Sequence, residues 1–426
     1  MGAEATPGRA AEARPGVWRR VALFLAVMGP GLITASVDND AGGITTYSVA
    51  GAQYGTKLLW TLGPITVALI VVQEMSSRLG IVTGKGLADL IRENFGVRTT
   101  FWVSIALVFT NLANTIAEFA GVAASLQIFR IPPWASVPLV AVGVWFLVLK
   151  GSQRVVEKAF LVASLLYVAY PISMAMAKPD WGEVVRHTVT PTFHMDTAYV
   201  GLLIGMVGTT ISPWMQFYQQ ASIVEKNVRI EDYKFVRWDV ILGCVMASTV
   251  AFFIVMACGA TLFKSGIVIN TAEDAALALT PLAGEFAKVL FAVGLVNASL
   301  FAATILPLST TYTICEGMGW ESGVNKEFSE APQFMGLYTG LILFSGGLIL
   351  IPGAPLIKIM LVSQVVNGVL LPFVLIFILL LINKKDLMGA YVNGRINNWV
   401  SWASVAVLIG LSIALIVLAV RQMIAG

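Results

Sequence analysis

Apolar runs long enough to cross a lipid bilayer recur from one end of this 426-residue chain to the other. A helix needs about 20 apolar residues to span the hydrocarbon core of a bilayer. The chain is 57% apolar and 12% charged, and a soluble chain carries about twice that charged fraction. These observations predict an all-α integral membrane protein and leave no room for a soluble catalytic domain.

About eleven membrane-spanning helices are expected, and two of them are broken. A disordered cytoplasmic tail is expected over residues 1–18, and a single transmembrane domain over residues 19–426. The tail is not read as a signal peptide, because no cleavage site follows the first apolar stretch. The approximate spans are 20–50 (broken), 58–79, 101–128, 134–150, 156–177, 197–221 (broken), 236–263, 276–311, 333–352, 355–383 and 399–420.

The first and sixth spans each contain residues that interrupt a helix. The first carries Asp38, Asn39 and Asp40, followed by Gly42-Gly43, and the sixth is broken at Gly208-Thr-Thr-Ile-Ser-Pro213. A carboxylate at the bilayer centre costs roughly 2.5–3.5 kcal/mol, and proline removes a helical hydrogen bond. Broken helices in corresponding halves are typical of the midplane binding site of a transporter. The pattern therefore predicts an ion transporter.

The positions of the two breaks also predict an internal symmetry. Each half begins with an interrupted helix, which is typical of inverted five-helix repeats. Repeat one is expected over about 20–178 and repeat two over about 197–385, with an extra helix at about 399–420. No residue-level repeat supports this division, so it depends on the breaks alone.

The lysines and arginines predict the orientation. Most of the 27 basic residues precede the first helix or follow an even-numbered one, and the positive-inside rule makes those segments cytoplasmic. The N-terminus is then inside, and eleven spans place the C-terminus outside. This bias explains the net charge of +3 without a nucleic-acid partner.

The polar side chains near the breaks offer hard donor atoms. Carboxylates, amides and hydroxyls suit Mg²⁺, Ca²⁺ and Mn²⁺, whereas thiolates and thioethers select softer metals. Mg²⁺ keeps several waters when bound, so one or two carboxylates in a roomy polar cavity suit it. The candidate residues are Asp38, Asn39, Asp40, Thr209, Thr210, Ser212, Gln364 and Asn367.

Several motifs together resemble the Nramp family of divalent-metal transporters, across nearly the whole chain. Each motif alone is weakly specific, but their order and spacing are hard to obtain by chance. The resemblance implies a LeuT-like inverted 5+5 repeat with broken helices 1 and 6. The motifs are Gly29-Pro-Gly31, Asp40-Ala-Gly-Gly43, Ala117-Glu-Phe-Ala-Gly121, Ser212-Pro-Trp-Met215, Ser363–Phe373 and Asn383–Gly389.

The chain departs from the family pattern at the residues that bind metal. The family's aspartate is kept as Asp40, but its asparagine is replaced by Gly43 and its methionine by Ser212. Loss of the thioether removes the preference for transition metals over hard ions. Thr209 stands where the family has a small alanine. These changes resemble the Nramp-related magnesium transporters, a prokaryotic branch.

The residues that the family associates with proton passage are also changed. Its two histidines are replaced by Trp214 and Gln219, and its aspartate three residues before Glu118 is Thr115. Uncoupled uptake driven by the membrane potential is therefore expected. For a divalent ion, 100 mV supplies about 4.6 kcal/mol.

The resemblance implies a role for each candidate residue. Asp40 is expected to hold the ion, assisted by Thr209, Ser212 and unwound carbonyls near Gly43, and Gly43 and Ser212 are expected to enlarge the cavity so that the ion stays partly hydrated. Further metal-binding candidates are Asn39, Thr210 and Gln364, and the permeation path is expected to include Asp38, Glu118 and Asn367. Asp38 and Asn39 alternatively cap the half-helices, and Gln364 and Asn367 alternatively join two helices.

The expected function is uptake of Mg²⁺, and also Mn²⁺, across the inner (plasma) membrane, with no cofactor beyond the transported ion. No nucleic acid and no obligate protein partner is expected, and the lipid bilayer surrounds the chain. The alternatives are a proton-coupled Mn²⁺ transporter and a sodium-coupled symporter of an organic solute. An intramembrane enzyme is disfavoured, because the spans carry no His/Glu, Ser/Lys or HExxH arrangement.

Overall fold

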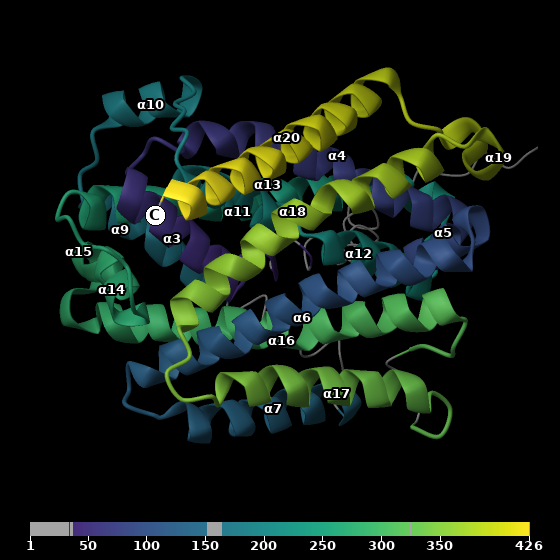
Figure 1. The fold of residues 1–426 in the computed structure, drawn as a ribbon, viewed down its shortest axis with the longest axis horizontal. Helices are drawn as coiled ribbons and strands as arrows, with labels where there is room; N and C mark the ends of the chain where they lie inside the picture. The colour runs from purple at the N-terminus through teal and green to yellow at the C-terminus, as the bar shows by residue number, and fades with distance from the viewer. Residues whose placement is uncertain (1–33, 35–36, 151–163, 324–325, 327, 426) are drawn as a thin grey trace, which may run out of the picture.

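The computed structural model describes residues 34, 37–150, 164–323, 326 and 328–425, and every regular element among them is helical. Most of the long helices run roughly along the long axis of the molecule, and the last two cross it at an angle (Figure 1). The long ones are α4 (Leu59–Thr83), α6 (Val97–Gln127), α7 (Pro133–Lys150), α13 (Tyr233–Cys258), α16 (Ala287–Met318), α17 (Pro332–Ile349), α18 (Leu356–Ile382) and α20 (Arg395–Ala425).

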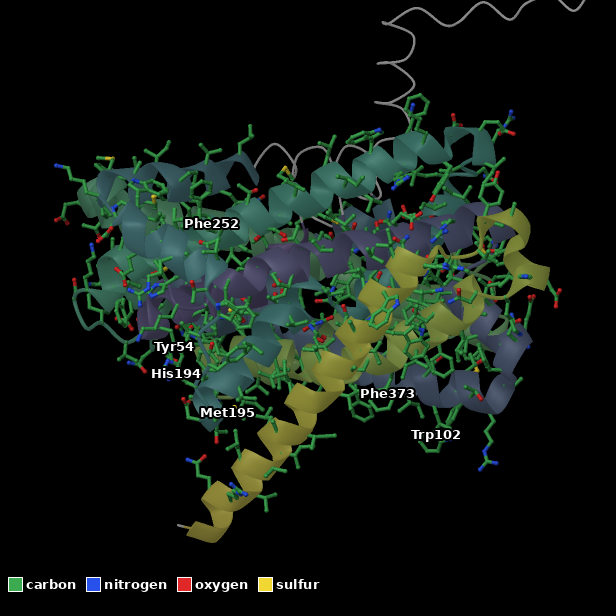
Figure 2. The ribbon with its side chains drawn as sticks, turned by 90° about the horizontal axis from the view of Figure 1, so that it is seen from above. Tyr54, Trp102, His194, Met195, Phe252 and Phe373 are labelled. Carbon is green, nitrogen blue, oxygen red and sulfur yellow. The ribbon has the colours of Figure 1, made fainter. Side chains whose placement is uncertain are left out.

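The hydropathy of these helices is that of a membrane protein. Eight helical segments of the described residues are long and apolar enough to cross a bilayer. They differ in burial: the most apolar window of Thr197–Glu225 is 83% buried, whereas that of Arg395–Gln422 is 11% buried. The interrupted segment is therefore the centre of the bundle, and α20 is its periphery. Trp102 and Phe373 point outward from the bundle (Figure 2), where a bilayer would cover them.

The sixth span is broken where the sequence predicts. Two residues separate helix α11 (Thr197–Thr210) from α12 (Pro213–Glu225). Pro213 is the first residue of α12, a position where its missing N–H costs no helical hydrogen bond. Ser212 before it has extended backbone angles. Ile211 and Ser212 therefore form the break: both have non-helical backbone angles, although the Ile211 N–H still bonds the Val207 carbonyl and the Ser212 carbonyl accepts from the Met215 N–H.

The first span is also interrupted as predicted. Val37 and Asp38 are helical, Asn39 and Asp40 are not, and α3 (Ala41–Tyr54) begins directly after them. The expected tail at 1–18 and the entrance motif at 29–31 lie outside the described residues. The same holds for 151–163, and the described end of the fifth span is α9 (Ala169–Met176) with the 3-10 turn before it.

Two segments between the expected spans contain short helices. Helix α5 (Leu87–Phe95) lies within 81–100, and α10 (Trp181–Val189) lies within 178–196. His187 on α10 is bonded through Nδ1 to Thr56 Oγ1 at 2.7 Å. His194 stacks on Tyr54 with 6.3 Å between ring centroids (Figure 2). Both rings are thus used in packing the connection between α3 and α4.

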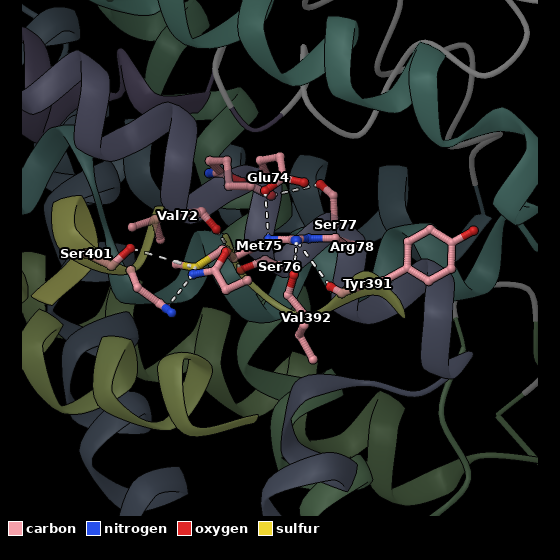
Figure 3. Close-up of polar contacts among 12 residues, drawn as sticks. Val72, Glu74, Met75, Ser76, Ser77, Arg78, Tyr391, Val392 and Ser401 are labelled. Atoms are coloured by element: carbon pink, nitrogen blue, oxygen red, sulfur yellow. Dashed lines mark hydrogen bonds and ion pairs between the residues drawn. The ribbon is translucent and has the colours of Figure 1, made fainter. Parts of the chain in front are cut away.

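A buried ion pair ties three elements together at the end of the bundle where the basic segments meet. Arg78 on α4 donates to Glu74 at 3.1 Å, to Asn393 Oδ1 at 2.7 Å and to the carbonyl of Tyr391 at 3.1 Å (Figure 3). The hydroxyl of Tyr233, the first residue of α13, donates to the same Glu74. The loop before α20 is therefore attached to α4 and α13.

Candidate functional site

Asp40 caps the N-terminus of α3. Its Oδ1 accepts a hydrogen bond from the Gly43 N–H at 2.6 Å, and the residue is 3% exposed. The first turn of a helix presents unpaired N–H groups and a partial positive charge, which stabilise a carboxylate there. The residue expected to hold the ion is thus placed at the break by its own helix cap.

Oxygen atoms of three kinds converge beside Gly43. Outside the backbone of α3, the atoms nearest to the position that a Cβ on Gly43 would take are the Asp38 carbonyl oxygen at 2.7 Å, Thr209 Oγ1 at 3.0 Å and Asp40 Oδ1 at 3.3 Å. They come from both broken spans. A carboxylate, a carbonyl and a hydroxyl are the donors that bind hard cations.

The space beside Gly43 is therefore occupied, which differs from the expectation that this glycine enlarges a cavity. A Cβ there would overlap the Asp38 carbonyl. The reason is that the chain turns at Asn39 and Asp40, which brings the Asp38 carbonyl to the first turn of α3. Glycine at this position lets the oxygens approach each other rather than leaving open room.

Glu118 on α6 adds a second carboxyl to the site. Its Oε2 accepts from the Ala41 N–H at 3.2 Å, its carboxyl group lies next to that of Asp40, and it is fully buried. One turn along α6, a Cβ on Gly121 would lie 2.4 Å from the Cβ of Ala41. The close approach of the two helices at Gly121 brings Glu118 to the start of α3.

The hydroxyls of the sixth span have different surroundings. Thr209 Oγ1 is buried with no hydrogen-bond partner. Ser212 Oγ donates to the Gly208 carbonyl at 2.7 Å. Thr210 Oγ1 bonds the Met206 carbonyl at 2.7 Å and the Tyr47 hydroxyl at 2.7 Å. The structure thus brings Thr209 to the converging oxygens and engages Thr210 in the contact between α11 and α3.

Asp38 and Asn39 do not cap the half-helices with their side chains. Both Asp38 carboxylate oxygens and Asn39 Oδ1 are buried without a hydrogen-bond partner. The carbonyl of Asn39 accepts from the Tyr167 hydroxyl at 2.8 Å. The cap that the sequence assigned to these residues as an alternative is provided by Asp40.

Gln364 and Asn367 on α18 belong to a cluster of amides. Asn367 Nδ2 donates to Gln364 Oε1 at 2.8 Å and to Asn114 Oδ1 at 2.9 Å, and Asn114 Nδ2 donates back to Asn367 Oδ1 at 3.0 Å. Asn367 therefore joins two helices, α18 and α6, which is the alternative that the sequence offered for it. The Gln364 amide nitrogen lies 1.8 Å from the position of a Cβ on Gly42, so it covers the first turn of α3.

The sequence did not identify two residues that contact the candidate site: Asn114, which bonds Asn367, and Tyr167, which bonds the Asn39 carbonyl. Asn114 lies one helical turn before Glu118 on α6, a spacing that places it on the same face. That spacing is the signal that would have identified it. Tyr167 is one aromatic residue in an apolar span, and nothing in its sequence context distinguishes it.

The three residues at the family's proton-carrying positions are neutral, and two of them are hydrogen-bonded. Gln219 accepts from Thr34 Oγ1 at 3.1 Å and donates to Ser77 Oγ at 3.0 Å. Thr115 Oγ1 donates to the Asn111 carbonyl at 2.7 Å. Trp214 Nε1 is buried without a partner. None of these groups titrates near neutral pH.

A cavity of about 910 Å³ lies at the C-terminal end of α6, opposite to the end held by Arg78. Its wall includes Ala124, one turn beyond Gly121. Met360 on α18 lies next to this wall, and its Sδ is 3.6 Å from the position of a Cβ on Gly121. The same sulfur accepts from Thr45 Oγ1 of α3 at 3.5 Å. Met360 therefore contacts α3 at Thr45 and lies close to α6 at Gly121.

A metal centre built only from strongly coordinating side chains is absent from the part of the chain that the structure describes. No group of three or more His, Cys, Asp and Glu residues there could hold a metal ion. A cation beside Asp40 would therefore depend on hydroxyl and carbonyl oxygens as well.

Comparison with known proteins gives a consistent picture. The family model Nramp, described as natural resistance-associated macrophage protein-like, matches residues 31–418. The divalent metal cation transporters MntH of Bacillus subtilis and Deinococcus radiodurans are 27% and 28% identical to the chain; each match covers 92% of this chain, and 92% and 90% of the relative.

Solved structures share the fold. The Eremococcus coleocola manganese transporter, in complex with an aromatic bis-isothiourea substituted compound, superposes with a TM-score of 0.75 at 21% identity, covering 94% of this chain and 88% of that one. MhsT in complex with L-phenylalanine superposes with a TM-score of 0.62 at 15% identity, covering 94% and 98%. The predicted all-α fold with a LeuT-like arrangement is confirmed.

Proposed function

The chain belongs to the Nramp family, and on this premise we propose that it carries divalent metal ions across the membrane, Mg²⁺ foremost and Mn²⁺ as a second substrate. The observation that carries the choice of ion is the set of oxygens around Gly43. The three atoms nearest to that point are a carbonyl, a hydroxyl and a carboxylate oxygen. Donors of this kind favour Mg²⁺ and Mn²⁺ over softer metals.

Asp40 attracts and holds the ion, and Thr209 and the Asp38 carbonyl share its coordination. Ser212, Asn39 and Gln364 contact the ion directly or bind its water ligands. Thr210 supports the site by joining α11 to Tyr47 of α3. The remaining positions that Mg²⁺ fills by preference are taken by water. The unpartnered oxygens of Thr209 and Asn39 support this assignment, because buried polar groups without partners are costly unless water or a ligand meets them.

Transport is driven by the membrane potential and proceeds by alternating access. Two charges moving through 100 mV gain about 4.6 kcal/mol, which is roughly a thousandfold accumulation. The ion enters from the cavity bounded by Ala124 and leaves at the end where Arg78 lies. We propose that the protein lies in the plasma membrane with its basic segments facing the cytoplasm. The direction of transport is then inward.

A second candidate function is proton-coupled Mn²⁺ transport. The observation in its favour is the contact between the carboxyl groups of Glu118 and Asp40. Two adjacent buried carboxylates cannot both stay ionised without a cation or a proton between them. A proton that leaves this pair when the metal arrives would couple the two fluxes. The Eremococcus coleocola transporter of the same fold is named for manganese, the ion of this candidate.

Uptake into proteoliposomes at a clamped potential tests both candidates. Mg²⁺, Mn²⁺ and Ca²⁺ are supplied separately, and the internal pH is recorded. We expect Mg²⁺ and Mn²⁺ uptake without proton flux, and its loss in Asp40→Ala. Thr110→Val is a matched control, because the Thr110 hydroxyl bonds only the backbone of its own helix. Uptake of Mn²⁺ with protons and without Mg²⁺ would establish the second candidate instead.

A further inference from the structure

Three buried side-chain amides form a chain that leads from α6 to the candidate ion site. Asn114 and Asn367 donate to each other's oxygens, at 3.0 Å and 2.9 Å, and Asn367 also donates to Gln364 Oε1 at 2.8 Å. All three residues are completely buried. We call Asn114, Asn367 and Gln364 the amide triad.

The backbone beneath the triad is fixed. A Cβ on Gly208 would lie 2.1 Å from the Gln364 carbonyl oxygen and 2.3 Å from the Gly368 nitrogen, so α11 and α18 touch through their backbones. A Cβ on Gly368 would lie 2.4 Å from the Ile204 carbonyl oxygen. Packing at backbone contact does not yield without strain. A turn of the side-chain amides leaves this backbone contact unchanged.

The triad presents the wrong atom for binding a cation. Gln364 Oε1 is held by Asn367, while Nε2 faces Gly42 and has no hydrogen-bond partner. An amide N–H₂ group is a donor and repels a cation, whereas the amide oxygen is a ligand. For Gln364 to bind the ion, its amide must turn over.

A concerted turn of all three amides keeps every hydrogen bond within the triad. After the turn, Asn367 Oδ1 accepts from both Asn114 and Gln364, and Asn367 Nδ2 donates to the Asn114 oxygen. Each amide has both donors and acceptors, so the exchange is chemically balanced. The 3.4 Å contact from Asn367 Nδ2 to Ser212 Oγ is lost in the turn, because the single hydrogen of the serine hydroxyl is donated to the Gly208 carbonyl. Gln364 Oε1 now faces α3.

We propose that Asn114 and Asn367 are positioning residues that switch Gln364 between a donor-facing empty state and an oxygen-facing, cation-binding state. The inference rests on the proposed function, since it concerns the ion held beside Asp40. It adds two residues that act on the ion only through Gln364. Because the two states keep the same three hydrogen bonds within the triad and differ outside it by the long contact to Ser212, the cation itself decides between them.

A double-mutant cycle on the concentration dependence of Mg²⁺ uptake tests the proposal. Leucine has nearly the shape of asparagine and no hydrogen-bonding atoms. We expect Asn114→Leu and Asn367→Leu each to raise KM about five- to tenfold, with kcat within about twofold. In the Gln364→Leu background, neither change should alter KM by more than about twofold. Asn297→Leu, a buried amide on α16 outside the triad, should leave KM unchanged.

Asn367→Asp gives a directional test. A carboxylate only accepts hydrogen bonds, so Gln364 must turn its nitrogen to residue 367 and its oxygen to α3. We expect KM to stay at or below the parental value, opposite to Asn367→Leu. The effect of the added negative charge alone is obtained by comparing the KM of the double variant Asn367→Asp/Gln364→Leu with that of Gln364→Leu.

Calorimetric titration of the solubilised protein with Mn²⁺ follows binding where a variant carries too little flux. Effects of Asn114→Leu that persist undiminished in the Gln364→Leu background would overturn the switch while leaving the proposed function intact. A parental chain that neither binds nor carries Mg²⁺ or Mn²⁺ would refute the proposed function and the switch with it.

Discussion

Adding a single methyl group at Gly43 tests the candidate site most directly. In Gly43→Ala the new Cβ would lie 2.7 Å from the Asp38 carbonyl oxygen, 3.0 Å from Thr209 Oγ1 and 3.3 Å from Asp40 Oδ1. Ordinary contact distances are roughly 3.5 Å or more, so the carbonyl must retreat by roughly 0.8 Å. The methyl group also occupies the point on which the three oxygens converge.

The magnitude follows from the cost of overpacking, which is about 1–3 kcal/mol for an inserted methyl group in a packed interior. If this cost falls on the ion-bound state, the rate of uptake at low Mg²⁺ falls about five- to 150-fold. The affected oxygens belong to the ion's surroundings, so the loss should appear mainly in KM rather than in the amount of folded protein.

The assay is initial-rate uptake of Mg²⁺ and Mn²⁺ into proteoliposomes, normalised to the amount of reconstituted protein. Gly340→Ala is the matched control, because a Cβ at Gly340 meets nothing within 4 Å. Gly42→Ala is a graded comparison, since its Cβ meets the movable end of Gln364. Parental uptake by Gly43→Ala would refute the placement of the ion beside this glycine.

Three further changes have distinct expected results. Thr209→Val should lower Mg²⁺ uptake about three- to tenfold without changing thermal stability, because the Thr209 hydroxyl has no protein partner to lose; a lowered melting temperature with parental uptake would contradict this. Gly208→Ala should destabilise the protein by about 1–3 kcal/mol, because its Cβ would meet backbone atoms of α18, and a thermal melt compared with Gly336→Ala checks this. Arg78→Ala should lower the free energy of unfolding by about 3–5 kcal/mol, because it leaves the buried Glu74 without its cationic partner. Lys85→Ala, at the exposed ion pair with Glu93, should lower it by under about 1 kcal/mol. Equal melting temperatures for the two variants would refute the role of burial.

The sequence by itself determined the helices, the two breaks and the donor chemistry. Long apolar runs must form helices in a bilayer, where backbone groups have no water to bond. Pro213 interrupts one span because it lacks an N–H group, and the aspartates and glycines over residues 38–43 interrupt the other. These effects act over a few neighbouring residues, so they can be read from the chain without knowing its fold.

Only the tertiary structure decided which polar groups meet. Asn114 and Asn367 are 253 residues apart, and Glu118 reaches Ala41 because Gly121 lets α6 and α3 touch. The occupied space beside Gly43 depends on how the chain turns before α3, which its composition does not specify. The rotation of each helix is set by the packing of all its neighbours. The sequence therefore defines the atoms available to an ion, and the packing of the helices determines where they converge.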